Sequence, residues 1–278
     1  SGKVWNGKPS EAGKTTFEVD ENTGALKSLC LDGEELLASP VTISLFRPAT
    51  DNDNRDRMGA KLWRKAGLHT LTQKVVSLKE SKTSATAQVN ILNVTGKKVG
   101  DATLEYTLNH NGSLKVQTTF QPDTTWVKSI ARLGLTFEMN DTYGNVTYLG
   151  RGEHETYIDR NQSGKIGIYT TTPEKMFHYY VIPQSTGNRT DVRWVKLADD
   201  SGKGCWIESD SPFQFSALPF SDLLLEKALH INDLERNGRI TVHLDAKQAG
   251  VLLHADRGCC RRIWFRWESK HLLSPFIP

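Results

Sequence analysis

The sequence predicts an all-β protein built as one large antiparallel β-sandwich. Apolar and polar residues alternate with a period of two along most of the chain, which is typical of half-buried strands. Gly, Asn and Asp clusters separate these runs, and helical patterns do not alternate with them. With 278 residues, of which 37% are hydrophobic and 24% charged, the chain can bury an extensive core and is too apolar for general disorder.

The strands follow from turn chemistry along the chain. Asp32-Gly33 follows an alternating run and suits a two-residue hairpin turn, because this dipeptide tolerates positive φ. Residues 102–108 and 114–120 alternate on either side of the turn at 109–112, which predicts a second hairpin. Further strands are expected at residues 133–139, 192–197, 205–207, 213–217 and 240–244.

Only one segment has clear helical periodicity. Ser221 and Asp222 are good N-cap residues, and Leu and Ala recur at helical spacing over residues 224–229. We therefore expect a short crossover helix there. Residues 140–145, rich in Asn, are a candidate boundary between two halves of the chain.

Composition excludes several classes of partner. The 35 basic and 32 acidic residues are spread along the chain, so no overall field favours nucleic acid or an acidic membrane. No apolar run approaches the length of a membrane span, and we expect a soluble protein. The opening SGKVWNGKPS has neither a start Met nor a signal-peptide core, so residues 1–13 are expected to be a linker or a tag-derived lead-in.

Metal chemistry has little support in the sequence. The four cysteines lack the CxxC spacing of zinc sites, and no HExxH motif is present. Asp51-Asn52-Asp53-Asn54 begins like an EF-hand, but Asp56 stands at the sixth position and Leu62 at the twelfth, where Gly and Glu are needed. An Asx-rich turn is therefore favoured over a looser cation site, and we predict no metal.

Two groups of residues are candidates for carbohydrate chemistry. Glu153, Glu155 and Asp159 lie in GRGEHETYIDR, where two carboxylates on one strand face could act as a catalytic pair. The same alternation is typical of a solvated strand face, and this interpretation is favoured. Trp63 and Trp194 lie in segments rich in Arg, Asn and Asp, a combination that suits sugar stacking, although core filling is the commoner role of a tryptophan.

Four motifs occur in a fixed order along the chain. The first is FEVDENTGALKSLCLDGEELLASPVTISLFRPATDNDNR, which ends in an R-x-P-x-D-N-D segment starting at Arg47. LWRKAGL at 62–68, GRGEHETYIDR at 150–160 and PQSTGNRTDVRW at 183–194 follow. Together, over residues 14–251, these motifs resemble the C-terminal region of lactose-operon-type β-galactosidases of glycoside hydrolase family two.

This resemblance implies a supersandwich related to the galactose-mutarotase-like fold. It also implies a non-catalytic C-terminal domain of a bacterial β-galactosidase, whose catalytic glutamates belong to a separate (β/α)-barrel. We therefore expect no catalytic residue in this chain and no activity from it alone. Its partners would be the barrel and other domains of the parent enzyme, with the galactoside bound through the intact enzyme. Nucleic acid and membrane partners are not expected.

The resemblance also assigns roles to particular residues. The stretch after the D-N-D motif, residues 54–61, would be a mobile loop at the active-site entrance. The loop residues are expected to anchor or form a lid. They would belong to an active-site wall that also packs against other domains. Arg47, Trp63 and Trp194 are our candidates for sugar contact. The substrate-entrance loop comprises Asp51, Asn52, Asp53, Asn54 and Arg55. Intact family enzymes use Mg and Na at sites mainly on other domains, so no cofactor is expected here. The compartment would be bacterial cytoplasm or periplasm.

The chain departs from this pattern after Val251. Family members carry a glycine-rich segment with a tryptophan there, whereas Arg257 stands at the matching position in this chain. Residues 252–278 are therefore expected to be an atypical tail without strand alternation, in which Trp264 and Trp267 are weak candidates for sugar contact.

Two other functions stay open. A freestanding carbohydrate-binding module would use the aromatic and polar side chains around a shallow cleft. An aldose epimerase would need a histidine acid and a carboxylate base in one cleft, for which His154 or His178 with Glu155 or Asp159 are the candidates.

Overall fold

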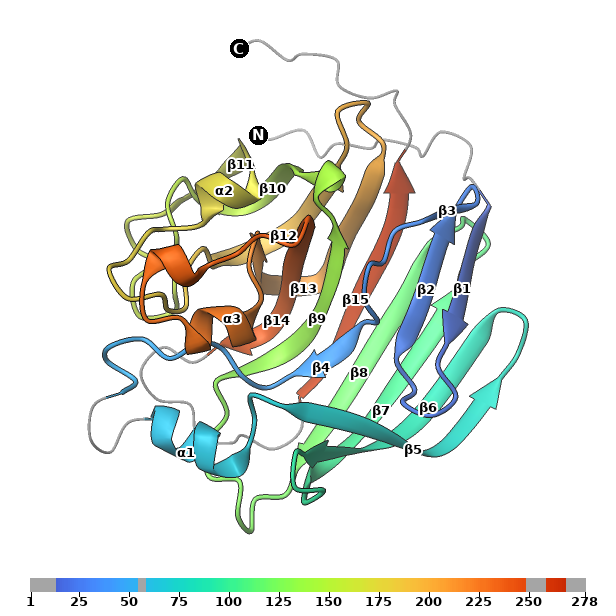
Figure 1. Cartoon of the computed structure of the whole chain (residues 1–278). Coiled ribbons are helices and arrows are strands. Elements are labelled where there is room, and N and C mark those ends of the chain that lie inside the picture. The colour runs from blue at the N-terminus through green and yellow to red at the C-terminus, as the bar shows by residue number, and fades with distance from the viewer. Residues whose placement is uncertain (1–13, 55–58, 249–258, 269–278) are drawn as a thin grey trace.

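The computed structural model describes residues 14–54, 59–248 and 259–268, the last range as a strand whose backbone alone is considered. Two antiparallel sheets, of three and twelve strands, make up most of the fold (Figure 1). Their inner faces and the short helices contribute to one buried hydrophobic cluster. The structure confirms the predicted all-β antiparallel sandwich.

The small sheet contains β1 (Thr15–Val19), β2 (Leu26–Leu31) and β3 (Glu34–Glu35), in that order. Asp32 and Gly33 join β2 to β3 with φ values of 54° and 82°. Leu31 lies opposite Glu34, so the loop has two residues, as the sequence predicts.

The large sheet runs in the order β11-β10-β12-β13-β15-β8-β7-β6-β5, and β14, β9 and β4 branch from β13. The hairpin predicted around residues 109–112 is confirmed, because Leu108 of β7 pairs with Leu114 of β8. The strands are β4 (Thr42–Ser44), β5 (Leu71–Glu80), β6 (Ser84–Asn93), β7 (Lys98–Leu108), β8 (Leu114–Pro122), β9 (Arg132–Asn140), β10 (Asn145–Gly152), β11 (Lys165–Thr171), β12 (Arg189–Ala198), β13 (Gly204–Leu218), β14 (Arg239–Gln248) and β15 (Cys259–Glu268).

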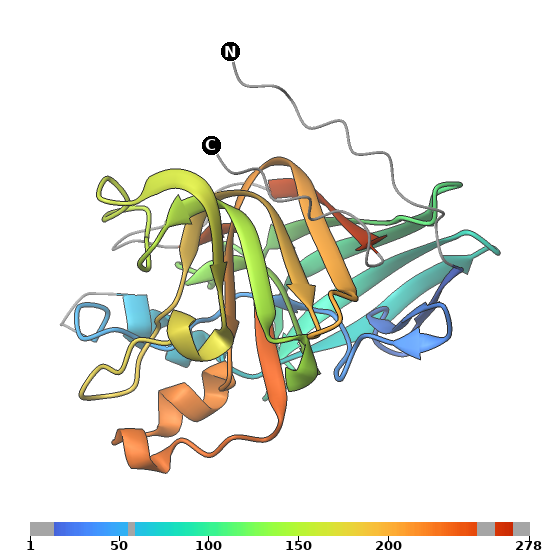
Figure 2. The same cartoon turned by 90° about the horizontal axis from the view of Figure 1, so that it is seen from above.

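The large sheet divides at the long strand β13. Its first part, 204–209, pairs with β15, whereas its last part, 214–218, pairs with β14. One branch continues through β12, β10 and β11, and the other through β14, β9 and β4. Figure 2 shows the molecule from above, with β5–β8 (teal to green) on one side and β10–β14 (yellow-green to orange) on the other. The division leaves one face of β4, β9 and β14 available for polar side chains.

The helices are short. They are α1 (Gly59–Ala66), α2 (Pro173–Met176) and α3 (Asp222–Lys227), with 3₁₀ turns η1 (Asp141–Tyr143) and η2 (Ile231–Asp233). The crossover helix is confirmed as α3, whose cap Ser221 accepts a hydrogen bond from the Leu224 amide through its hydroxyl (3.3 Å). No helix within the described ranges has the length and apolarity that crossing a bilayer requires.

The sequence did not anticipate two features of the sheet. Strands on both sides of the candidate boundary at residues 140–145, β9 and β10, belong to the same large sheet. Residues 259–268 of the tail form β15, which lies between β8 and β13 with Ile263 opposite both Val116 and Ser209. The expectation that this stretch lacks strand structure is therefore wrong. The stretch has no period-two alternation, but its backbone pairs on both edges, and such pairing stabilises a central strand. The rest of the tail lies outside the described residues.

Tyr106 joins the two sheets and gives a test of the packing. Its side chain is buried on β7, and its hydroxyl donates a 2.9 Å hydrogen bond to the Gly24 carbonyl in the β1–β2 turn. Tyr106→Phe removes the donor and leaves a buried carbonyl, so we expect the free energy of unfolding to fall by about 1–2 kcal/mol. Urea unfolding measures the change. Tyr179→Phe, at an exposed tyrosine, is the control and should have little effect; equal losses would contradict the packing role.

Candidate functional site

The turn at residues 50–54 contains most of the predicted entrance-loop residues, and the carboxylate of Asp53 fixes it. Asp53 is 4% exposed and accepts hydrogen bonds from both terminal nitrogens of Arg47, at 2.6 and 3.2 Å. It also accepts from the Thr50 amide (2.8 Å) and hydroxyl (2.7 Å). These four donors occupy both oxygens of Asp53, so this residue anchors the turn instead of facing a ligand.

Arg47 and Trp63 support the turn from inside the fold. Arg47 is 3% exposed, and its guanidinium carbon lies 5.3 Å from the centre of the Trp63 ring. Trp63 is 2% exposed and donates its indole N–H to the Ser129 hydroxyl (3.1 Å). Both side chains are buried in the described structure, where they support the turn, and a sugar contact by Arg47 or Trp63 stays a prediction.

The outer residues of the turn are solvent-exposed. Asp51, Asn52 and Asn54 are exposed, and Arg55 lies outside the described residues. The Asp51 amide donates to the Gln184 side-chain oxygen (3.3 Å), which links the turn to the loop before β12. Part of the predicted mobile loop is helical, because α1 begins at Gly59. The entrance role of this turn stays a prediction.

A second network ties the turn to two helices. Arg64 of α1 donates to the Asn54 side-chain oxygen (2.7 Å) and pairs with Glu226 of α3 (2.6 Å). The other carboxylate oxygen of Glu226 accepts from the Ala49 amide (3.0 Å). The turn is therefore held by two sets of contacts, the buried bonds of Asp53 and the hydrogen bond from Arg64 to Asn54.

Trp194 lies elsewhere, on the face of β12 opposite the core. Its partly exposed ring stacks on Trp206 of β13, with ring centres 4.2 Å apart and planes 21° apart. Trp206 donates its indole N–H to Glu208 (3.1 Å). A sugar contact by Trp194 stays a prediction.

The carboxylates of GRGEHETYIDR are not arranged as a catalytic pair. Glu155 accepts hydrogen bonds from the Tyr180 hydroxyl, Arg160 (2.6 Å), the Thr186 hydroxyl (3.0 Å) and the Gly187 amide (2.8 Å). Burial alone would raise the pKa of Glu155, but these donors and the charge of Arg160 hold its pKa below the usual value. An ionised and fully bonded carboxylate cannot act as a general acid, and Glu153 and Asp159 are exposed.

The two histidine candidates for an epimerase each contact a residue other than the proposed carboxylate base. His154 contacts the Ser163 hydroxyl (2.8 Å), and the His178 ring lies 4.5 Å from the Tyr180 ring. Both histidines are exposed, and neither shares a hydrogen bond with Glu155 or Asp159 in the described structure. In the described structure these residues therefore do not form a hydrogen-bonded acid–base pair.

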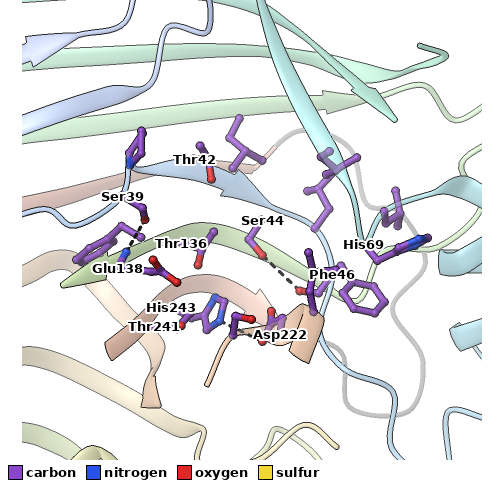
Figure 3. A pocket seen from close by; sticks show the side chains of 18 residues that line it. Ser39, Thr42, Ser44, Phe46, His69, Thr136, Glu138, Asp222, Thr241 and His243 are labelled. Carbon is purple, nitrogen blue, oxygen red and sulfur yellow. Dashed lines mark hydrogen bonds and ion pairs between the residues drawn. The ribbon is translucent and has the colours of Figure 1, made fainter. Parts of the chain in front are cut away.

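A polar pocket of about 370 Å³ lies on the face of β4, β9 and β14. Thr42 and Thr136 are paired across β4 and β9, and Thr136 is paired with His243 across β9 and β14. Figure 3 shows these side chains rising from the three strands, with Asp222 of α3 beside His243. Leu71 and Leu223 also line the pocket. The pocket thus has hydroxyl groups, two imidazoles (His69 and His243) and two carboxylates (Glu138 and Asp222) against apolar walls.

Four ionisable side chains form a buried cluster beside this pocket. Asp222 is 3.2 Å from both Arg132 and the Nε2 atom of His243, and Asp245 is 3.4 Å from Arg132. Burial alone would raise the pKa of Asp222, but His243 and Arg132 hold it below the usual value. Burial raises the pKa of Asp245, and Arg132 and His243 offset this only in part.

Sequence reasoning missed this cluster, although one signal was available. His243 and Asp245 are two residues apart in a strand, so they share a face, and an ionisable pair inside the apolar run ITVHL is unusual. Arg132 and Asp222 come from distant segments and had no such signal. Within the described ranges, no group of His, Cys, Asp and Glu is placed to hold a metal ion.

The pKa of Asp245 leads to a pH prediction. The folded state favours the protonated form of Asp245, so ionisation of this carboxyl opposes folding. The stability that the protonated form contributes is therefore lost as the pH rises from 3.8 through the raised pKa. Asp245→Asn cannot ionise, and its free energy of unfolding should gain on that of the unchanged chain as the pH rises. Urea unfolding at a series of pH values measures this.

Asp222→Asn is the matched control. The pKa of Asp222 is lowered, so its ionised form stabilises the fold above 3.8 and that contribution disappears as the pH falls through the lowered pKa. The loss of unfolding free energy caused by Asp222→Asn should be largest at neutral pH and should decrease in acid. Identical pH profiles for the two variants would contradict the assignment of charges.

A family model described as beta galactosidase small chain matches residues 11–259. The beta-galactosidase of Priestia megaterium is 31% identical over 243 residues, which are 85% of this chain and 23% of that relative. Beta-galactosidase BgaC of Bifidobacterium adolescentis is 28% identical over 89% of this chain and 24% of the relative. The chain therefore spans about a quarter of the length of these relatives.

Solved structures show the same fold at low sequence identity. An aldose epimerase homologue from C. elegans has a TM-score of 0.54 and 12% identity, over 92% of this chain and 96% of that one. A galactose 1-epimerase from Lactobacillus acidophilus has a TM-score of 0.50 and 10% identity, over 94% and 93%. These similarities confirm the galactose-mutarotase-like sandwich and concern the fold alone.

Proposed function

Because the chain belongs to the beta-galactosidase small-chain family, we propose that it is the C-terminal, non-catalytic domain of a bacterial β-galactosidase. The coverage carries this proposal: the match extends over 85% of this chain but only 23% of the Priestia megaterium enzyme. Most of that enzyme, with room for a complete catalytic domain, lies outside the matched stretch.

In the intact enzyme, terminal β-galactosides are hydrolysed with retention through a covalent glycosyl intermediate. That chemistry needs two carboxyl groups about 5–5.5 Å apart, one of them protonated. The bonded, ionised state of Glu155 suits structural support, which agrees with catalytic glutamates on another domain. Mg and Na sites would also lie mainly on the other domains.

This chain contributes a wall and a loop to the active site, and it packs against the rest of the enzyme. The turn at 50–54 carries the exposed side chains of Asp51, Asn52 and Asn54 on a base fixed by Asp53. A rigid base lets such a turn hold a position beside the substrate entrance, with Arg55 following it. The partners are the other domains of the parent enzyme, in a soluble protein of bacterial cytoplasm or periplasm.

An aldose epimerase is the second candidate, because the fold and one histidine–carboxylate pair favour it. His243 and Asp222 both line the polar pocket, but they lie 3.2 Å apart and pair with one another. An epimerase needs its acid and base on separate sides of a bound sugar. The geometry therefore supports the epimerase, and likewise a freestanding carbohydrate-binding module, less well than the β-galactosidase domain.

Complementation tests the proposed function. We expect the purified chain to release no nitrophenol from a nitrophenyl β-galactoside above a mock preparation. Mixed with the part of the Priestia megaterium beta-galactosidase outside the matched stretch, it should give activity that neither component has alone. Turnover by the chain alone, or accelerated mutarotation of galactose, would contradict the proposal. So would a mixture that forms no complex.

A further inference from the structure

Exposed apolar side chains are concentrated in one segment of the sequence. Eleven large hydrophobic residues are exposed in the described structure, and six of them lie within the 25 residues from 158 to 182. The six are Ile158, Ile166, Ile168, Tyr179, Val181 and Ile182, with exposed fractions from 48% to 87%. Scattered exposed apolar residues are ordinary, but a concentration of them marks an interaction surface. These six residues are called the 158–182 surface below.

The segment that carries this surface is firmly held. The carboxylate of Glu155 bonds Arg160, Tyr180 and Thr186, and so joins the loop before β11 to the loop after α2. Met176 and Phe177, between β11 and the second loop, are buried in the core. The exposed residues therefore project from a fixed framework, which reduces the conformational entropy lost on docking.

Strand β11 adds a second feature of an interface. It is the end strand of the large sheet, and β10 is its one neighbour among the described strands. Ile166 and Ile168 alternate on one of its faces, with Lys165 as its single charged residue. Edge strands of stable monomers are usually blocked by charges, Pro or bulges, so an apolar edge such as β11 suits a strand that another surface covers.

We propose that the 158–182 surface is the contact through which this chain docks on the rest of its β-galactosidase. The inference rests on the proposed function. In the Priestia megaterium relative the matched stretch is 23% of the polypeptide, so a large partner surface is available. Gln184, two residues after Ile182, accepts a hydrogen bond from the Asp51 amide (3.3 Å), which links this segment to the turn at 50–54.

The chemistry of the surface defines its partner. The surface consists of isoleucine, valine and tyrosine side chains, and the charged Asp159 and Arg160 follow Ile158 in the sequence, a composition that suits an interface. The partner is therefore an apolar patch on a folded domain of the same enzyme. Docking there would hold the turn at 50–54 against the catalytic part.

Binding by variant chains tests the proposal. The probe is the part of the Priestia megaterium beta-galactosidase outside the matched stretch, titrated with the full chain by calorimetry. Val181→Asp and Ile168→Asp place a charge in the surface and should each raise the dissociation constant about tenfold or more. Val94→Asp is the matched control: Val94 is 69% exposed, close to the 67% of Ile168, but lies in the β6–β7 turn. It should bind like the unchanged chain.

Each outcome has a distinct meaning. Weakening by Val181→Asp and Ile168→Asp with unweakened Val94→Asp binding supports the inference, provided that circular dichroism shows each variant folded. A complex unaffected by both surface variants overturns it while leaving the proposed function intact. No complex with any chain contradicts both. If sedimentation shows that the unchanged chain forms dimers which Val181→Asp dissociates, the surface binds a second copy and the inference is wrong.

Discussion

The buried ion pair between Arg47 and Asp53 is the constraint on which the rest of this site depends. A buried carboxylate is costly unless its oxygens are fully bonded, and Asp53 meets this requirement with two donors from Arg47 and two from Thr50. Any displacement of the turn would leave these charges unpaired in the interior. The turn therefore has one well-defined position, and the backbone that carries its exposed residues is fixed with it. Connections to α1, α3 and the loop at Gln184 extend this rigidity to the neighbouring surface.

The second buried group of charges differs in character. The cluster of Arg132, Asp222, His243 and Asp245 is only partly satisfied, since both oxygens of Asp245 lack a hydrogen-bond partner in the described structure. Partly satisfied polar groups in an interior reduce stability, and proteins retain them at functional or strained places. Two of its members, Asp222 and His243, line the polar pocket, and His243 lies on β14, which pairs with the last part of β13. A sheet that forks there can place polar groups on a face that an ordinary sandwich would fill with apolar residues.

Local features of the fold could be predicted from sequence, and long-range ones could not. The Asp32-Gly33 turn, the hairpin around 109–112 and the cap at Ser221 depend on a few adjacent residues, and all are confirmed. The burial of Trp63 and the pairing of Arg47 with Asp53 depend on packing between separate segments. Alternation alone gave no means of distinguishing an indole that faces solvent from one that lies under a turn. The motif order predicted the family, while the surface at 158–182 became visible only from the side-chain exposure in the folded structure.

Urea unfolding of an Asp53→Asn variant, followed by amide hydrogen exchange, tests whether the Arg47–Asp53 pair fixes the turn. Asparagine keeps the size of the side chain but removes the charge that balances Arg47, which leaves a buried cation uncompensated. We expect the free energy of unfolding to fall by about 3–5 kcal/mol. Exchange of the Asn54 and Ala60 amides, which bond the carbonyls of Thr50 and Asp53, should be faster. A loss below about 1 kcal/mol, typical of a surface pair, with unchanged exchange at these amides would contradict it.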